Sequence, residues 1–399
     1  MTVTNHLTPE TTTTDSAPVM LYNGTVHSTA EPYAEAMLVD NGQVAWLGSD
    51  ETAQRLRDEH TLAQDLDRAV VTPAFVGSAS VTLPQIEAGK LAEVLDLAAG
   101  SYGYSTLRLG VAVSVEKFSS ASHSELSGAL HQALRTAADH PVAVYPVIEL
   151  AGVHADGGAP SIAPVNTMLD LLGELDEAAE NPIALQLRFT EVRPNLLGVR
   201  SWCTEAGRQL FLECTDADAA SVVDAVVTSQ QHLRELKQTP SPVTPTVLAG
   251  FDSADSEDWQ RLLNTGVHVL LNRPGHLATA LRTGVPTAAA PPEGQNPWQL
   301  ISDHVHYEDD PVAVRAGFNA QTRGAYRSLV GATPESAQLN PGSAATYTVW
   351  EVEQLAVQTP NSTAAAWSTD TRARTPLLPF LDGVEMPRLL STVIAGQTL

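Results

Sequence analysis

The stretch Ala69-Val-Val-Thr-Pro-Ala-Phe-Val-Gly-Ser-Ala-Ser-Val-Thr82 decides how the rest of the chain is interpreted. An apolar run is broken by Thr72-Pro73, resumes at Ala74 and is followed by small polar residues. A proline, which has no N–H, is tolerated best near the start of a strand. The stretch therefore predicts a buried strand over Val70–Val76 that opens into a loop.

The composition sets limits on class and partners. The chain has 399 residues, of which 43% are hydrophobic, which is enough for a large core. Its 22 Lys and Arg against 46 Asp and Glu give a net charge of −24. Such a surface repels nucleic acid and anionic membranes, so we exclude both as partners.

The termini and the cysteines indicate a cytoplasmic protein. Residues 1–18 are Thr-rich and lack the basic and apolar regions of a signal peptide, so we expect a disordered tail. No apolar run approaches the ~18 residues that a membrane span needs. Cys203 and Cys214 do not make a disulfide framework, and we expect both thiols to be buried and inert.

From Pro73 to residue 335, apolar strands alternate with helical segments, a pattern typical of parallel βαβ units. Eight such units in roughly 260 residues match a TIM-like (β/α)8 barrel. The expected strands are Val70–Val76, Thr106–Ser114, Val142–Leu150, Ile183–Phe189, Gln209–Thr215, Pro245–Phe251, Val267–Leu271 and Pro286–Ala290.

Short strands flank the barrel on both sides. Residues 19–72 alternate and contain Asn41-Gly42, a strong type I′ hairpin turn. Residues 336–399 return to strands at Thr346–Trp350, Gln354–Gln358 and Leu389–Gly396. We expect the segments 19–72 and 336–399 to fold together into one small β-sandwich beside the barrel 73–335.

The segments before and after the barrel resemble the amidohydrolase superfamily, in particular its amidohydrolase 3-like branch. The resemblance rests on Leu21-Tyr-Asn-Gly-Thr-Val26, Ala36-Met-Leu-Val-Asp-Asn-Gly-Gln-Val-Ala-Trp-Leu-Gly48, Asn296-Pro-Trp298, Leu339-Asn-Pro-Gly-Ser343 and Thr392-Val-Ile-Ala-Gly-Gln397. It implies a barrel with a composite sandwich. It also implies hydrolysis of non-peptide C–N bonds by zinc or another divalent metal at the carboxyl-terminal mouth of the barrel.

The resemblance places the metal ligands at the ends of strands one, four, five, six and eight. In this sequence the matching positions hold residues that are not the expected ligands: Ala79, Val81, Arg188, Leu212, Gly250 and Pro292. The sequence therefore predicts a degraded metal site, with no catalytic residue, no metal and no cofactor.

Polar residues near the ends of the strands are candidates for a small-molecule pocket. They are Glu149, His154, Arg188, Asp216, Asp252, Arg273 and His276, although each alone also fits plain surface. We hypothesise that Arg188 and Asp216 form a salt bridge that replaces the charge of the metal. The one His-x-His of the chain, His304-Val-His306, falls in a predicted helix where i and i+2 diverge, so we expect both to be solvated.

Three functions stay open from the sequence. The first is a pseudoenzyme that keeps a small-molecule pocket or binds a partner. The second is an active C–N hydrolase with an unorthodox metal site built from His154, His276 and nearby carboxylates. The third is a structural partner of an active paralogue, and a homodimer is also compatible with the sequence.

Overall fold

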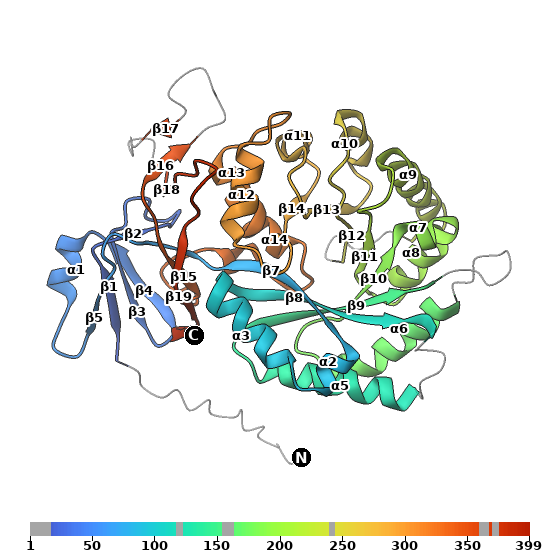
Figure 1. Ribbon diagram of the computed structural model, residues 1–399, viewed down its shortest axis with the longest axis horizontal. Helices are drawn as coiled ribbons and strands as arrows, with labels where there is room; N and C mark the ends of the chain where they lie inside the picture. Colours follow the sequence, from blue (N-terminus) through green and yellow to red (C-terminus); the bar gives the residue numbers. More distant parts are fainter. Residues whose placement is uncertain (1–16, 117–122, 154–162, 239–243, 359–366, 369–374) are drawn as a thin grey trace, which may run out of the picture.

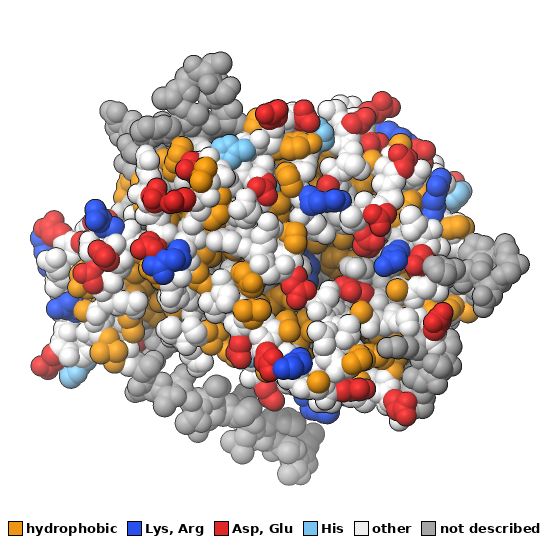
Figure 2. Space-filling view, viewed as in Figure 1, with side chains coloured by type: hydrophobic (Ala, Val, Ile, Leu, Met, Phe, Trp, Pro, Cys, Tyr) orange, Lys and Arg blue, Asp and Glu red, His pale blue; other side chains and the backbone are white. Residues whose placement is uncertain are grey.

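The computed structural model describes residues 17–116, 123–153, 163–238, 244–358, 367–368 and 375–399, so the predicted tail falls largely outside the described residues. Figure 1 shows a sandwich of blue and red strands beside a larger unit of alternating strands and helices. Within the described part of the chain, no helix has the length and apolarity to span a membrane. Asp and Glu side chains are distributed over the visible face rather than gathered in one patch (Figure 2).

The larger unit is built on an eight-stranded sheet in which every neighbouring pair is parallel and follows the order of the chain. This confirms the TIM-like fold. The strands are β7 (Phe75–Thr82), β8 (Tyr104–Ser114), β9 (Ala143–Ala151), β10 (Ala184–Arg188), β11 (Leu210–Glu213), β12 (Thr246–Ala249), β13 (Val267–Leu271) and β14 (Thr287–Ala289).

Helices connect these strands and cover the outer face of the curled sheet (Figure 1). Most of them pack their apolar sides against the outward-facing residues of the strands in one large hydrophobic cluster, whereas Ala325 and Tyr326 pack with inward-facing strand residues such as Val76. The helices are α2 (Leu83–Glu87), α3 (Leu91–Tyr102), α5 (His123–Ala138), α6 (Ala163–Leu175), α7 (Phe189–Val192), α8 (Leu196–Glu205), α9 (Ala219–Glu235), α10 (Ser256–Leu262), α11 (Leu277–Thr283), α12 (Pro297–Val305), α13 (Val314–Gln321) and α14 (Arg323–Arg327).

The opening stretch forms two strands instead of one strand and a loop. The first, β6 (Val70–Pro73), pairs with the sandwich, and the second, β7, continues without a loop to Thr82. Pro73 ends β6 rather than starting a strand, so its missing N–H falls where the chain leaves one sheet for the other. The expected loop after Val76 is therefore wrong.

The two ends of the chain build the sandwich together, as predicted. One sheet has the order β4-β3-β1-β5 and the other β2-β6-β15-β19-β20. Leu21 and Met37 of the first sheet share a core with Val71, Val349 and Val393 of the second. The strands are β1 (Val19–Tyr22), β2 (Thr25–Val26), β3 (Ala36–Asp40), β4 (Gln43–Gly48), β5 (Leu62–Asp65), β15 (Tyr347–Glu351), β19 (Arg388–Ile394) and β20 (Gln397–Thr398), with helix α1 (Asp50–Leu56) beside them.

Two details of the sandwich test the sequence pattern. Asn41 and Gly42 have φ values of 48° and 73°, as a type I′ turn between β3 and β4 requires. The predicted strand Gln354–Gln358 exists as β16 (Leu355–Gln358), but it pairs with β17 (Trp367–Ser368) and β18 (Leu378–Pro379) in a separate small sheet. Strand β16 therefore does not enlarge the sandwich.

An aromatic cluster joins the sandwich to the barrel. Phe75 at the start of β7 makes edge-to-face contacts with Trp298, Phe318 and Trp350 at centroid distances of 5.4, 5.5 and 5.9 Å. Trp298 also stacks on Phe318 at 5.7 Å. Because Trp350 comes from β15, these rings tie the carboxyl-terminal half of the sandwich to the first strand and last helices of the barrel.

We expect Trp350→Ala to lower the free energy of unfolding by about 3–5 kcal/mol, since it leaves a large cavity where three aromatic rings meet. Denaturant titration followed by circular dichroism measures the change. The matched control is Trp46→Ala at the partly exposed Trp46 on β4, which we expect to cost clearly less. An equal loss in both variants would contradict the assigned role of this junction.

Candidate functional site

The alternation of side chains along β7 decides which residues face the inside of the barrel. Ser78 and Ser80 face a cavity, and the Ser80 hydroxyl reaches Glu149 on β9. Ala79, which also borders this cavity, and Val81 belong to the hydrophobic cluster that contains Ile86 of α2. Since side chains alternate between the two faces of a strand, Ser78 and Ser80 point into the cavity and Val81 lies on the outer face.

The other predicted metal positions divide in the same way. Leu212 packs in the outer cluster, so the residues of β11 that face inward are Phe211 and Glu213. Gly250 follows the end of β12 with a φ of 68°, a backbone conformation that suits glycine. Arg188 is exposed at the end of β10, and Pro292 does line the cavity.

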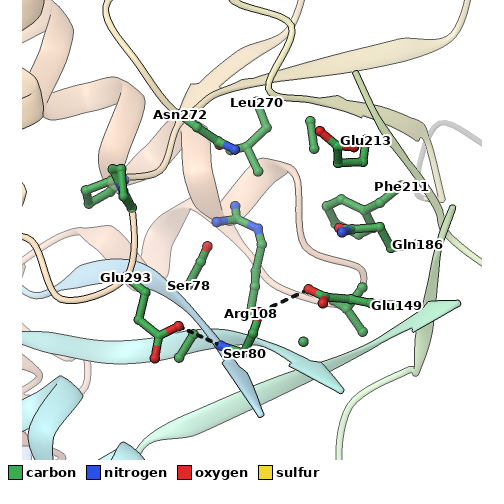
Figure 3. Close-up of a pocket in the computed structure, with 16 residues that line it drawn as sticks. Ser78, Ser80, Arg108, Glu149, Gln186, Phe211, Glu213, Leu270, Asn272 and Glu293 are labelled. Carbon is green, nitrogen blue, oxygen red and sulfur yellow. Dashed lines mark hydrogen bonds between the residues drawn. The ribbon is translucent and has the colours of Figure 1, made fainter. Parts of the chain in front are cut away.

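The cavity has a volume of about 200 Å³ and lies inside the curled sheet. Residues from β7 to β13 and from the segment after β14 line it (Figure 3). This is where a (β/α)8 barrel places its functional groups. The polar side chains that line it are Ser78, Ser80, Arg108, Glu149, Gln186, Glu213, Asn272 and Glu293.

Ser80 forms hydrogen bonds to two of the glutamates at the place where the first strand of the barrel meets the segment after the eighth. Its hydroxyl donates to Glu149 Oε1 at 3.1 Å, and its backbone N–H donates to Glu293 Oε2 at 3.2 Å. No ladder joins β14 to β7 in the described sheet, so the Glu293 side chain satisfies a backbone donor that a neighbouring strand would otherwise pair. The contact brings the first strand and the segment after the eighth together at the cavity.

Gly110 on β8 makes this arrangement possible. A Cβ atom at this position would lie 2.1 Å from Glu149 Oε1 and 2.7 Å from Ser80 Oγ. Any larger residue would therefore displace the carboxylate or break its hydrogen bond.

Burial raises the pKa of Glu149, and the neighbouring carboxylates Glu293 and Glu213 raise it further. The hydrogen bond from Ser80 acts in the opposite direction and stabilises the charged form. The cavity therefore holds acidic groups that repel one another, a pattern that is frequent at binding and catalytic sites.

Arg108 on β8 is the cation of the cavity and is only 4% exposed. Its Nη2 donates to Ala325 O at 3.1 Å and to Ser328 Oγ at 2.5 Å, while Nε and Nη1 have no hydrogen-bond partner. Burial lowers its pKa to about 10, which leaves the guanidinium charged at neutral pH. Within the described chain no carboxylate forms an ion pair with it.

The sequence did not single out Arg108 as a site residue. The available signal for Arg108 was a charged residue inside the apolar run Leu107-Arg-Leu109 of a predicted strand. Charged residues are seldom fully buried, so such a residue facing the interior of a barrel calls for a function. Glu213 has a weaker signal, because it ends the apolar run Leu210-Phe-Leu212.

Only some of the polar residues that were predicted to form a small-molecule pocket lie at the cavity. Glu149 lines it, and Arg188 lines an adjoining hollow of about 450 Å³ that shares Glu149, Gln186 and Glu213 with the cavity. Asp216 is exposed, and no described ion pair joins it to Arg188, so the hypothesised salt bridge is wrong. Both side chains are solvated and need no partner to offset burial.

The remaining predicted residues have other surroundings. Asp252 pairs with Arg273 at 3.3 Å and accepts the backbone N–H of Asn272, and burial raises its pKa. His154 lies outside the described residues.

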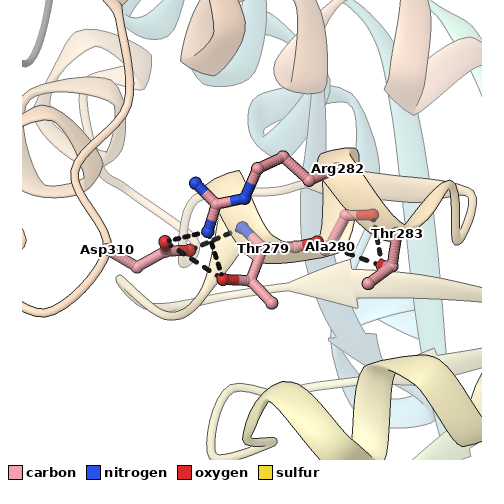
Figure 4. A network of polar contacts seen from close by, with 5 residues as sticks. All are labelled: Thr279, Ala280, Arg282, Thr283 and Asp310. Carbon is pink, nitrogen blue, oxygen red and sulfur yellow. Dashed lines mark hydrogen bonds and ion pairs between the residues drawn. The ribbon is translucent and has the colours of Figure 1, made fainter.

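His276 stands at the N-cap position of α11 without a capping hydrogen bond from its side chain, and its ring packs edge-to-face on Tyr307. Beside it, Asp310 accepts hydrogen bonds from the Thr279 backbone and hydroxyl and pairs with Arg282 (Figure 4). His276 therefore sits at an anchored junction between α11 and the segment after α12.

The donor chemistry of the cavity does not fit the metal site that the sequence resemblance implies. Among the described residues, no group of three His, Cys, Asp or Glu could hold a metal ion. The cavity lining contains no imidazole, and the buried cation Arg108 lies in the same space as the glutamates. His304 is buried, contrary to the solvated position expected for it, whereas His306 is exposed and contacts Leu381 O at 3.1 Å.

Glu149→Gln should raise the free energy of unfolding at pH 7. A carboxyl whose pKa is higher in the folded state binds its proton more tightly there, so its ionisation lowers stability as the pH rises. The gain should therefore be smaller at pH 4, where the wild type is already largely protonated. Urea midpoints at the two pH values measure the gain. Glu59→Gln, at a side chain that is 86% exposed, serves as the control and should show no such difference.

The two cysteines should resist alkylation in the native protein. Burial raises the pKa of the Cys203 thiol to about 12 and that of Cys214 further, so little reactive thiolate exists near neutral pH. Mass spectrometry should show almost no iodoacetamide adduct at pH 8 in the folded protein and two adducts in guanidinium chloride. Rapid labelling of either cysteine in the folded protein would contradict the assigned burial.

Comparison with known proteins places the architecture. No family model matches the sequence, and no curated protein matches it either. Among solved structures, guanine deaminase from E. coli superposes with a TM-score of 0.64 at 12% identity, over 96% of this chain and 99% of that chain. An amidohydrolase from a Sargasso Sea environmental sample gives 0.61 at 11% identity, over 96% and 92%.

An adenosine deaminase from Xanthomonas campestris with bound zinc gives 0.59 at 12% identity, over 95% and 92% of the two chains. These similarities extend over nearly the whole length of each protein, so they include both the barrel and the composite sandwich. The resemblance inferred from the sequence is thus confirmed in the architecture: the chain has the fold of the amidohydrolases and deaminases.

Proposed function

We propose that the chain is a divergent member of the amidohydrolase superfamily that has lost metal-dependent hydrolysis and binds a small molecule in the barrel cavity. One observation supports the proposal above all. The cavity-facing residues at the ends of the relevant strands are serines, amides, apolar residues and single glutamates: Ser78, Ser80, Gln186, Glu213, Ala249 and Pro292.

A metal-activated water needs a cation held by several ligands at once. Glu149, Glu213 and Glu293 come from three separate elements, and two of them are already engaged by Ser80. The one cation among the residues that line the cavity, Arg108, has no lone pair to offer and is not a metal ligand. We therefore derive no hydrolytic step for this cavity.

The cavity is better suited to binding. It combines apolar walls from Val147, Phe211 and Leu270 with a few polar groups directed inward, as small-molecule sites generally do. The adjoining hollow shares its wall with the cavity and leads toward the exposed Arg188. A ligand could enter through this hollow and reach the buried polar groups.

Metal analysis tests the loss of the metal site. After growth with zinc and purification without chelator, we expect less than about a tenth of an equivalent of metal by mass spectrometry. Added zinc or manganese should leave the melting temperature unchanged, because nothing binds the native state. Near-stoichiometric metal that is lost in His154→Ala, His276→Ala or Glu213→Gln would overturn the proposal and favour an active hydrolase with an unorthodox site.

A further inference from the structure

The N–H groups of Arg108 that lack an acceptor indicate what kind of chemical group the cavity binds. A guanidinium carries five N–H hydrogens. Nη2 uses its two on Ala325 O and Ser328 Oγ, which leaves those of Nε and Nη1 without an acceptor. In Figure 3 the guanidinium extends into the space between Ser78, Asn272 and Gln186. A charged group this deeply buried requires a partner of opposite charge or several acceptors.

The residues that the structure describes do not supply that partner. Glu149 and Glu293 are directed to Ser80, and burial alone determines the pKa shift of Arg108, with no contribution from a nearby carboxylate. The neutral amides of Gln186 and Asn272 also line the cavity, but neither makes a hydrogen bond to the guanidinium. An anionic group of a ligand would accept the hydrogen bonds that Nε and Nη1 of Arg108 can donate.

Negatively charged side chains line another part of the cavity wall. Glu149, Glu213 and Glu293 line the cavity, and the first two also line the outer hollow. The carboxylates of Glu293 and Glu213 raise the pKa of Glu149. A positively charged group between them would relieve this repulsion.

We propose that the cavity binds a compact zwitterion, with its anionic group on Arg108 and its ammonium group among Glu149, Glu213 and Glu293. This inference rests on the proposed binding function and specifies its ligand class. A cavity of about 200 Å³ lies below the usual range for drug-sized ligands, so the molecule is small. A simple anion would leave the glutamates uncompensated, and a simple cation would leave Arg108 uncompensated.

A series of ω-amino acids tests the charge arrangement directly. Glycine, β-alanine, 4-aminobutyrate and 5-aminovalerate differ only in the separation of the two charges. At about 10 mM each, we expect one or two neighbouring members to raise the melting temperature, because a ligand that binds only the native state stabilises it. The corresponding fatty acid and ω-amino amide, which each lack one charge, should have a much smaller effect.

Two variants separate the two ends of the ligand. Arg108→Met keeps the approximate volume, removes the charge and should weaken binding of the best ω-amino acid roughly thirtyfold or more in calorimetric titration. Glu213→Gln should weaken the same ligand while leaving the weak response to the fatty acid unchanged. Arg55→Met, at a side chain that is 71% exposed and remote from the cavity, is the matched control and should bind normally.

Several results would overturn the inference. These are no stabilisation by any member of the series, equal stabilisation by the fatty acid, or full binding by Arg108→Met. The analogues lacking one charge keep the test decisive if Arg108→Met fails to fold. Metal analysis reports separately on the proposed loss of hydrolysis, so metal-free protein that ignores every ω-amino acid would refute this ligand class alone.

Discussion

The segment Val70–Thr82 has to satisfy two sheets at once, and the rest of the structure depends on this constraint. Its first half is hydrogen-bonded to β15 in the sandwich, and its second half is the first strand of the barrel. Phe75 lies just after the change of sheet and is packed between three aromatic rings. After the register irregularity between Phe75 and Val76, the alternation along β7 places Ser78 and Ser80 on the cavity, with Ala79 at its border and Val81 in the outer cluster.

This alternation also determines the electrostatics of the cavity. Ser80 can reach glutamates on both of its sides only because it faces inward and because Gly110 opposite leaves room for the Glu149 side chain. Arg108 faces the same interior from the middle of β8, with its Nη2 directed to Ala325 and Ser328. The interior of the barrel thus holds a buried guanidinium as well as carboxylates.

The sequence predicted the order of elements well and the site only in part. Seven of the eight barrel strands were expected close to their observed positions, because long apolar runs between helical segments leave few alternatives, whereas the first was placed too early, at Val70–Val76 instead of Phe75–Thr82. The phase of β7 could not be predicted, since Gly77-Ser-Ala-Ser80 are all small and give no contrast between an inner and an outer face. Arg108 escaped attention because the state of its donors depends on Ala325 and Ser328, which are more than 200 positions away in sequence. The salt bridge between Arg188 and Asp216 was predicted only because the two residues follow adjacent strands. Both side chains are exposed to solvent, so neither needs a charged partner.

The pairing of β6 with β15 also has a consequence for how the chain folds while it is being made. About 270 residues separate the two strands, so at ribosomal elongation rates on the order of ten seconds to a minute pass before β6 can meet its partner. During this interval Val70 and Val71, which are fully buried in the finished protein, border an unpaired strand edge on the nascent chain. The division of the sandwich between the two ends of the chain thus leaves this edge of β6 without its partner until most of the chain has been made.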